Sequence, residues 1–352
     1  MSLPSSVGWT ASAAQLKVAH RARQVVLIAI LTGLFALINP VQASAHIVGT
    51  GGSPTDYRTV LTGIRPAVPA VAVTVGLGGQ WVRVTNQGAA TILILGYQGE
   101  PFLQLSDNRV QVNQLSSTAF QTGLIPAAPA PETPAAAPAW KKLSEGSGAT
   151  WTDGRIAPPQ SSPASRSWQL PLVVDGQQVT ALGTRDLIPP PSPWPWLVVL
   201  VILVVAVGAL GRRRDWHRPI AVVIGVGILS FSLHVLGTAF APQQSGRVVA
   251  WVSVGLLAGF AVVVGVVSVV SALRRSAATS DRAVVTGAII LLLAATDISV
   301  LWNSELPFGG PAFLDRGLTV IFYGAGLGLI VAGVRRVRAA KAAGLTAGGT
   351  SG

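Results

Sequence analysis

The sequence predicts a membrane protein of the β + α class, with an extracytoplasmic antiparallel β-sandwich followed by a five-helix transmembrane bundle. Half of its 352 residues are hydrophobic and only 11% are charged, whereas soluble domains carry about 25% charged residues. The second half gathers its apolar residues in five long runs, and the first half separates short β-branched runs with turn residues. The formal net charge of +12 lies beside the apolar runs, so it predicts membrane orientation and no nucleic-acid partner.

Residues 1–45 are predicted to be a signal peptide. A basic region ends at Arg23, an apolar run follows it, and residues 43–45 (Ala-Ser-Ala) have the small-x-small pattern of a cleavage site. An uncleaved signal anchor is the alternative. Export places residues 46–195 outside the cytoplasm, and cleavage makes His46 the new N-terminus.

The exported part is predicted to be one β-domain in two portions, 46–123 and 140–188, joined by a Pro/Ala-rich linker or loop at 124–139. In the second portion, Asp175-Gly176 separates two strand-like runs, which is typical of a β-hairpin. We expect this hairpin to complete the sandwich, because an isolated hairpin is only marginally stable. Strands are expected at residues 58–64, 71–77, 81–86, 91–95, 110–112, 167–174 and 178–182.

Five apolar runs follow a Pro/Trp-rich junction at 189–195, and each is close to the ~20 residues that span a bilayer. The segments on one side of these runs carry eleven Lys and Arg residues, and those on the other side carry two, Arg247 and Arg316. The positive-inside rule therefore predicts a multi-pass plasma-membrane protein with a basic cytoplasmic tail at 335–352. The predicted helices, which together cover 196–334, are 196–211, 219–240, 248–272, 283–303 and 317–334.

Two ionisable residues fall inside the predicted spans, His234 and Asp297. Each lies roughly 9 Å below the outer boundary of its helix, at 1.5 Å of rise per residue. Gly227, Ser230 and Gly237 share a face with His234, and such a small, polar face packs against another helix. We predict a hydrogen-bonded His234–Asp297 pair. This pair is either a structural polar clasp or a proton or metal-ion waypoint open to the outer face. The remaining alternative is that the two residues do not meet.

His46 is the candidate metal ligand. A free α-amino group and an imidazole on one residue can chelate copper, although the predicted outer domain contains no second histidine. An incidental residue at a cleavage site is the alternative. The sequence has no cysteine, which excludes thiolate metal sites and cysteine nucleophiles. No catalytic residue and no cofactor are predicted. If copper is bound, as the alternative holds, the carboxylates that could add ligands to His46 are Asp56, Glu100, Asp107 and Asp153.

Two polar segments of the outer domain are predicted to be turns. Residues 96–102 contain two glycines and a proline, which is typical of a tight turn between strands, with a binding loop as the alternative. Residues 151–155 are predicted to form a turn capped by Asp153 rather than a site. In the helices, small residues predict close packing at Gly255 and Gly259, and at Gly324, Gly328 and Ala332.

Residues 95–102, 151–155 and 191–196, in this overall layout, resemble an uncharacterised family of actinobacterial membrane proteins. More remotely, the plan is similar to fused copper-resistance proteins, in which a periplasmic β-sandwich with an N-terminal histidine precedes a membrane bundle. The family pattern carries histidines in the segment 151–155, where this chain has Thr152 and Gly154. That departure argues against copper binding in this chain.

We therefore expect a non-enzymatic accessory or interaction subunit of a membrane or envelope assembly. Its expected partners are membrane lipid and a membrane or envelope protein. The alternative is a copper-binding or copper transport/resistance protein, with His46 in the outer domain and His234 and Asp297 below it.

Overall fold

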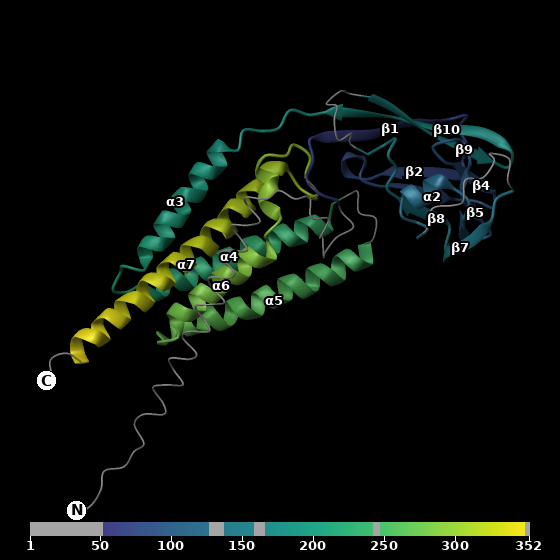
Figure 1. Cartoon of the computed structure of the whole chain (residues 1–352). Coiled ribbons are helices and arrows are strands. Elements are labelled where there is room, and N and C mark those ends of the chain that lie inside the picture. The colour runs from purple at the N-terminus through teal and green to yellow at the C-terminus, as the bar shows by residue number, and fades with distance from the viewer. Residues whose placement is uncertain (1–51, 127–136, 158–165, 242–246, 349–352) are drawn as a thin grey trace, which may run out of the picture.

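The computed structural model describes residues 52–126, 137–157, 166–241 and 247–348. These residues form an antiparallel β-region that ends at Leu187 and a helical region that starts at Trp194 (Figure 1). The predicted signal peptide, His46 and most of the predicted linker at 124–139 lie outside the described residues.

Two antiparallel sheets make up the described part of the β-region. The larger has the strand order β1-β10-β9-β4-β5-β6-β7, and the smaller has the order β2-β3-β8. The expected hairpin is confirmed: β9 and β10 pair along their lengths, and Asp175 and Gly176 take positive φ of 48° and 84° between them. The strands are Tyr57–Arg65, Val71–Val75, Val82–Asn86, Ile92–Leu95, Pro101–Ser106, Arg109–Asn113, Trp140–Glu145, Gly148–Trp151, Arg166–Val174 and Gln177–Leu187, from β1 to β10.

Sequence patterning does not single out β5 or β7. In β5, Phe102 and Leu103 are both buried although they are neighbours, because the register against β4 shifts at a bulge. The shift removes the strict apolar–polar alternation that identifies a strand. β7 is an edge strand with mostly exposed side chains, so it has no apolar face to recognise.

One hydrophobic core takes side chains from both sheets. On β3, Val82 and Val84 point to the same face and are fully buried in this core. The two sheets meet where Phe102 of β5 packs edge-to-face on Trp151 of β8, with ring centroids 5.7 Å apart. This contact brings the end of β8, and the turn that follows it, against the larger sheet.

Five α-helices follow in the described residues, and three of them, α4, α5 and α7, are long and apolar enough to span a membrane. The other two are shorter, with 17 residues in α3 and 15 in α6. The helices are Trp194–Leu210, His217–Ala239, Arg247–Leu273, Thr279–Leu293 and Ala312–Gly348, from α3 to α7.

The predicted helix at 283–303 is wrong at its C-terminal end. The α-helix stops at Leu293, and Asp297–Leu301 forms the separate 3₁₀-helix η2. Carbonyls freed where an α-helix stops need new donors, and the hydroxyl of Tyr323 donates to the carbonyl of Ala294. The break turns the chain so that Asp297 begins a new element.

The last predicted helix is wrong at both ends. The sequence predicts that this helix starts at residue 317, whereas α7 begins at Ala312, directly after Pro311. Proline presets the backbone for a helix start. The predicted tail at 335–352 is helical as far as Gly348, in keeping with the Ala, Lys and Arg residues there, which are strong helix formers.

Helix α7 lies at the centre of the bundle, with 72% of its most apolar stretch buried, whereas α5 lies at the edge with 28%. The predicted close packing at Gly324 and Gly328 is confirmed, because a Cβ built there would meet Leu203 and Val207 of α3 at 2.7 and 2.4 Å. The predicted packing at Gly255 and Gly259 is absent in the described residues: nothing lies within 4 Å of a Cβ built at either.

The β-region is attached to the bundle by the loop between η2 and α7. Thr55 and Glu305 exchange two backbone hydrogen bonds of 3.0 and 2.8 Å, as in a short antiparallel ladder. Asp56 accepts hydrogen bonds from the backbone and hydroxyl of Ser304, and Arg58 pairs with Glu305 at 2.7 Å. We call this set of contacts the junction.

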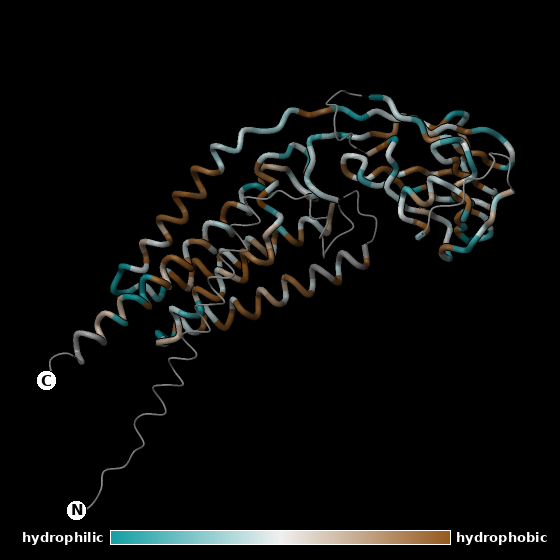
Figure 2. Tube along the Cα trace, viewed as in Figure 1, coloured by the Kyte–Doolittle hydropathy of each residue, from teal (hydrophilic) through white to brown (hydrophobic). Residues whose placement is uncertain are grey.

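The opposite end of the bundle carries most of the basic residues. There the turn between α3 and α4, the turn between α5 and α6 and the last part of α7 come together, and hydrophilic residues mark all three in Figure 2. We call this the basic end. The apolar residues lie between the basic end and the junction (Figures 1 and 2).

Candidate functional site

A buried triad of ionisable side chains lies near the junction end of the bundle. His234 Nε2 is 3.3 Å from Asp297 Oδ2, and His234 Nδ1 is 2.6 Å from Asp315 Oδ1. The side chains of His234 and Asp315 are 4% and 1% exposed, whereas that of Asp297 is 26% exposed. The imidazole thus has a carboxylate at each nitrogen, and only Asp297 is open to the surroundings.

Three elements position the triad. His234 lies in the last third of α4, Asp297 starts η2, and Asp315 lies in the first turn of α7. Phe308, in the loop between η2 and α7, stacks over the His234 ring with the ring centroids 6.5 Å apart. The loop lies directly on α4 because Gly309 donates a 2.9 Å hydrogen bond to the carbonyl of Gly237.

The structure therefore brings together the two residues predicted from their depth, His234 and Asp297, and adds a third. The sequence predicts a loop at Asp315, because the predicted helix starts two residues later, at 317. Pro311 followed by Ala312, Phe313 and Leu314 is the signal that could have placed Asp315 inside a helix.

The arrangement suits a clasp rather than a metal centre. An imidazolium carries a hydrogen on each ring nitrogen, so it can donate to both carboxylates at once. The acids lie at opposite nitrogens, so the three side chains do not converge on one point. No group of three or more His, Cys, Asp or Glu side chains that could hold a metal occurs within the described ranges. His46 lies outside them, and the copper alternative stays a prediction.

The two polar segments of the β-region meet in space, and both are turns. Gly96 to Glu100 connects β4 to β5, with a 2.7 Å backbone hydrogen bond closing the turn. In the other segment Asp153 is fully buried and caps its turn, accepting from the backbone of Arg155 at 2.9 Å and from the indole of Trp151 at 3.0 Å. The Arg155 guanidinium forms a fork on Asp153 and lies 5.0 Å over the Tyr97 ring.

Glu100 is held as a carboxylate by the helix α2, Ser117–Gln121. Its Oε1 accepts from the hydroxyls of Ser116 and Thr118 at 2.9 and 2.7 Å, and from the backbone of Thr118 at 3.1 Å. Burial raises the pKa of Glu100, but these hydrogen bonds outweigh burial and leave the pKa below its ordinary value. Glu100 thus fastens α2 to the 96–100 turn, which favours the turn over the binding-loop alternative.

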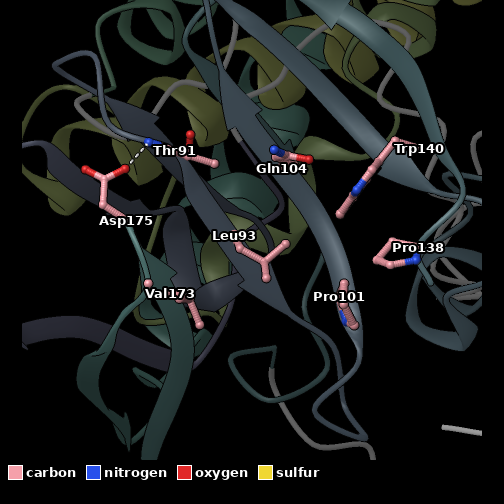
Figure 3. Close-up of a pocket in the computed structure, with 9 residues that line it drawn as sticks. Thr91, Leu93, Pro101, Gln104, Pro138, Trp140, Val173 and Asp175 are labelled. Carbon is pink, nitrogen blue, oxygen red and sulfur yellow. Dashed lines mark hydrogen bonds between the residues drawn. The ribbon is translucent and has the colours of Figure 1, made fainter. Parts of the chain in front are cut away.

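A groove of about 300 Å³ opens on the solvent-facing side of the larger sheet. Figure 3 shows Leu93 in the middle of the groove, with Trp140 and Pro138 on one side and Asp175 on the other. The backbone N–H of Thr91 donates a 2.8 Å hydrogen bond to Asp175. The side-chain amide of Gln104 and the indole N–H of Trp140 have no hydrogen-bond partner among the described residues. The lining residues are Thr91, Leu93, Pro101, Gln104, Pro138, Trp140, Val173, Asp175 and Gly176.

No protein-family model, curated protein or solved structure matches this chain.

The two carboxylates of the triad should differ in their contribution to stability. Asp315→Ala leaves a buried ring without its closest partner and should lower the free energy of unfolding by about 3 kcal/mol. Asp297→Ala removes a partly exposed and more distant carboxylate and should lower it by only about 1 kcal/mol. Denaturant unfolding of the full-length protein in micelles measures both values. Equal losses, or a larger loss for Asp297→Ala, would contradict the geometry.

Acidification should remove the stability that Glu100 supplies. Its pKa is lowered in the folded protein, so the unfolded chain binds this proton more readily. The contribution is complete above the reference value of 4.5 and is lost as pH falls through the lower folded value. In thermal unfolding of the full-length protein, the stability difference between the wild type and Glu100→Gln should shrink on acidification from about pH 7 to about pH 3. A difference that does not change with pH would rule this contribution out.

Proposed function

We propose that this chain is an integral plasma-membrane protein that acts as a non-enzymatic interaction subunit of a membrane or envelope assembly. The observation that carries the proposal is the groove beside Trp140 on the solvent-facing side of the larger sheet. Through this groove the β-region binds an extended segment of a partner protein outside the cytoplasm.

The bundle supports five membrane crossings. Helices α4, α5 and α7 are long enough alone. Helix α6 together with η2 extends the fourth segment from Thr279 to Leu301, and the 17 residues of α3 rise about 26 Å at 1.5 Å each. The basic end opposes the junction, so the positive-inside rule places the β-region outside and the end of α7 in the cytoplasm. The core shared by the two sheets supports a sandwich.

The lining of the groove suits an extended peptide. Trp140, Pro101 and Pro138 offer flat apolar surfaces, Leu93 and Val173 form the floor, and none of the described lining residues is basic. Aromatic- and proline-lined grooves bind extended, often proline-rich peptides, whose backbone carbonyls accept from open indole and amide donors. The N–H groups of Trp140 and Gln104, which no described residue engages, supply such donors.

The triad supports this role as a structural clasp. It joins α4, η2 and the start of α7, the elements that flank the loop carrying the junction. A clasp at this place fixes how the β-region is presented to a partner. The alternative, a proton or metal-ion waypoint, needs an open path, and two of the three side chains are almost fully buried.

Removal of the groove's indole should weaken partner binding. We expect Trp140→Ala to reduce the amount of cross-linked partner recovered with the full-length protein from native membranes by about tenfold, because aromatic anchors dominate such interfaces. The matched control is Leu143→Ala, which truncates an exposed apolar side chain on the same strand but outside the groove. Equal recovery with Trp140→Ala and Leu143→Ala would exclude the groove as the binding surface.

A further inference from the structure

An arginine at the basic end of the bundle has an unused pair of hydrogen-bond donors. The Arg336 guanidinium of α7 lies 5.1 Å over the ring of Trp216, which is 4% exposed and packs in the helical core. Atoms Nε and Nη2 of Arg336 are buried, and no residue in the described part of the chain pairs with either. A buried donor without a partner is destabilising, and a charged one more so.

These two atoms form the edge of the guanidinium that binds two oxygens side by side. The same edge is used elsewhere in this chain: Nε and Nη2 of Arg155 hold the two oxygens of Asp153 at 2.9 and 2.7 Å. In Arg58 the same two atoms donate to a single oxygen, Oε1 of Glu305. Arg336 presents this edge without an acid of the described chain in front of it.

The surroundings of Arg336 are also rich in positive charge. The ring of His217 lies 5.4 Å from that of Trp216, and its buried Nδ1 has no partner among the described residues. His217 is within electrostatic reach of Arg275 and Arg336. Among the described residues, the acid beside them is Asp215, which lies 3.4 Å from Arg275 and is within electrostatic reach of His217. Helix α4 begins at His217 with no acidic residue and no side-chain cap in its first turn, so its free N–H groups add positive potential.

We propose that Trp216, His217, Arg275 and Arg336 form a binding site for a phosphate ester at the basic end of the bundle. A phosphate group supplies two or more acceptor oxygens, as the Arg336 edge requires, and enough negative charge to balance several cations. Two sources carry this chemistry: the headgroup of an anionic phospholipid, which a basic pocket between helices at the cytoplasmic surface can bind, and a free phosphate. The site rests on the geometry of the bundle and is independent of the groove beside Trp140.

Lipid retention by the purified full-length protein tests this site. Native mass spectrometry of the protein with phosphatidylglycerol, and separately with phosphatidylcholine, measures how tightly each lipid is held. We expect phosphatidylglycerol to be preferred, and Arg336→Gln to weaken its binding about tenfold because two charge-assisted hydrogen bonds are lost. The matched control Arg338→Gln removes the same charge from an exposed position on the same helix and should change binding less than about twofold.

A second arm distinguishes the sources. Inorganic phosphate is titrated into the lipid-depleted protein, and Arg336-dependent phosphate binding without any preference for phosphatidylglycerol would identify a free phosphate as the ligand. Arg336→Lys keeps the charge but removes the planar edge, so this variant should fold and bind with intermediate strength. If Arg336→Gln does not elute as a folded, monodisperse species, Arg336→Lys takes its place in the comparison. The proposal is overturned if neither phosphatidylglycerol nor phosphate binds the wild type more tightly than the Arg336 variants, or if Arg338→Gln weakens binding as much as they do.

Discussion

The contact between His234 and Asp315 fixes the start of α7 against α4, and much of the remaining structure depends on it. With both ends of the 302–311 loop held, one at η2 and one at Asp315, Phe308 lies over the imidazole and Gly309 bonds to Gly237. The same loop carries Ser304 and Glu305, which bind the first residues of the β-region. A buried ionic contact in the bundle is thus connected through one short loop to the orientation of the β-region.

This connection gives the molecule two separate surfaces with different chemistry. At one extreme the face of the larger sheet exposes an apolar groove with open amide and indole donors. At the other the bundle ends in a basic cluster around Arg336, whose donors lack partners in the described chain. The proposed protein partner at the groove and the proposed phosphate ester at the basic end follow from these two chemistries.

Features set by local sequence periodicity could be predicted, whereas features set by tertiary contacts could not. The apolar runs at 219–240, 248–272 and 317–334 located α4, α5 and α7. The run at 283–303 placed Asp297 at the depth of His234, although α6 stops at Leu293 and Asp297 begins η2. The place of Asp315 in the triad was not predicted, because the start of α7 depends on Pro311 and on packing over α4. The groove combines side chains from strands far apart in sequence, such as Leu93 and Trp140, whose proximity depends on strand order and register. The stacking of Arg336 on Trp216 depends in the same way on helix packing.

We expect the junction to hold the β-region in one orientation on the bundle, and a distance measurement between spin labels tests this. The chain has no cysteine, so Gln178→Cys on β10 and Leu229→Cys on α4 give two specific, exposed labelling sites. Pulsed electron paramagnetic resonance of the full-length protein should give a single narrow distance distribution, which broadens when Asp56→Ala and Glu305→Ala are introduced together. A broad distribution in the unaltered background, or one that the double substitution leaves unchanged, would contradict the claim.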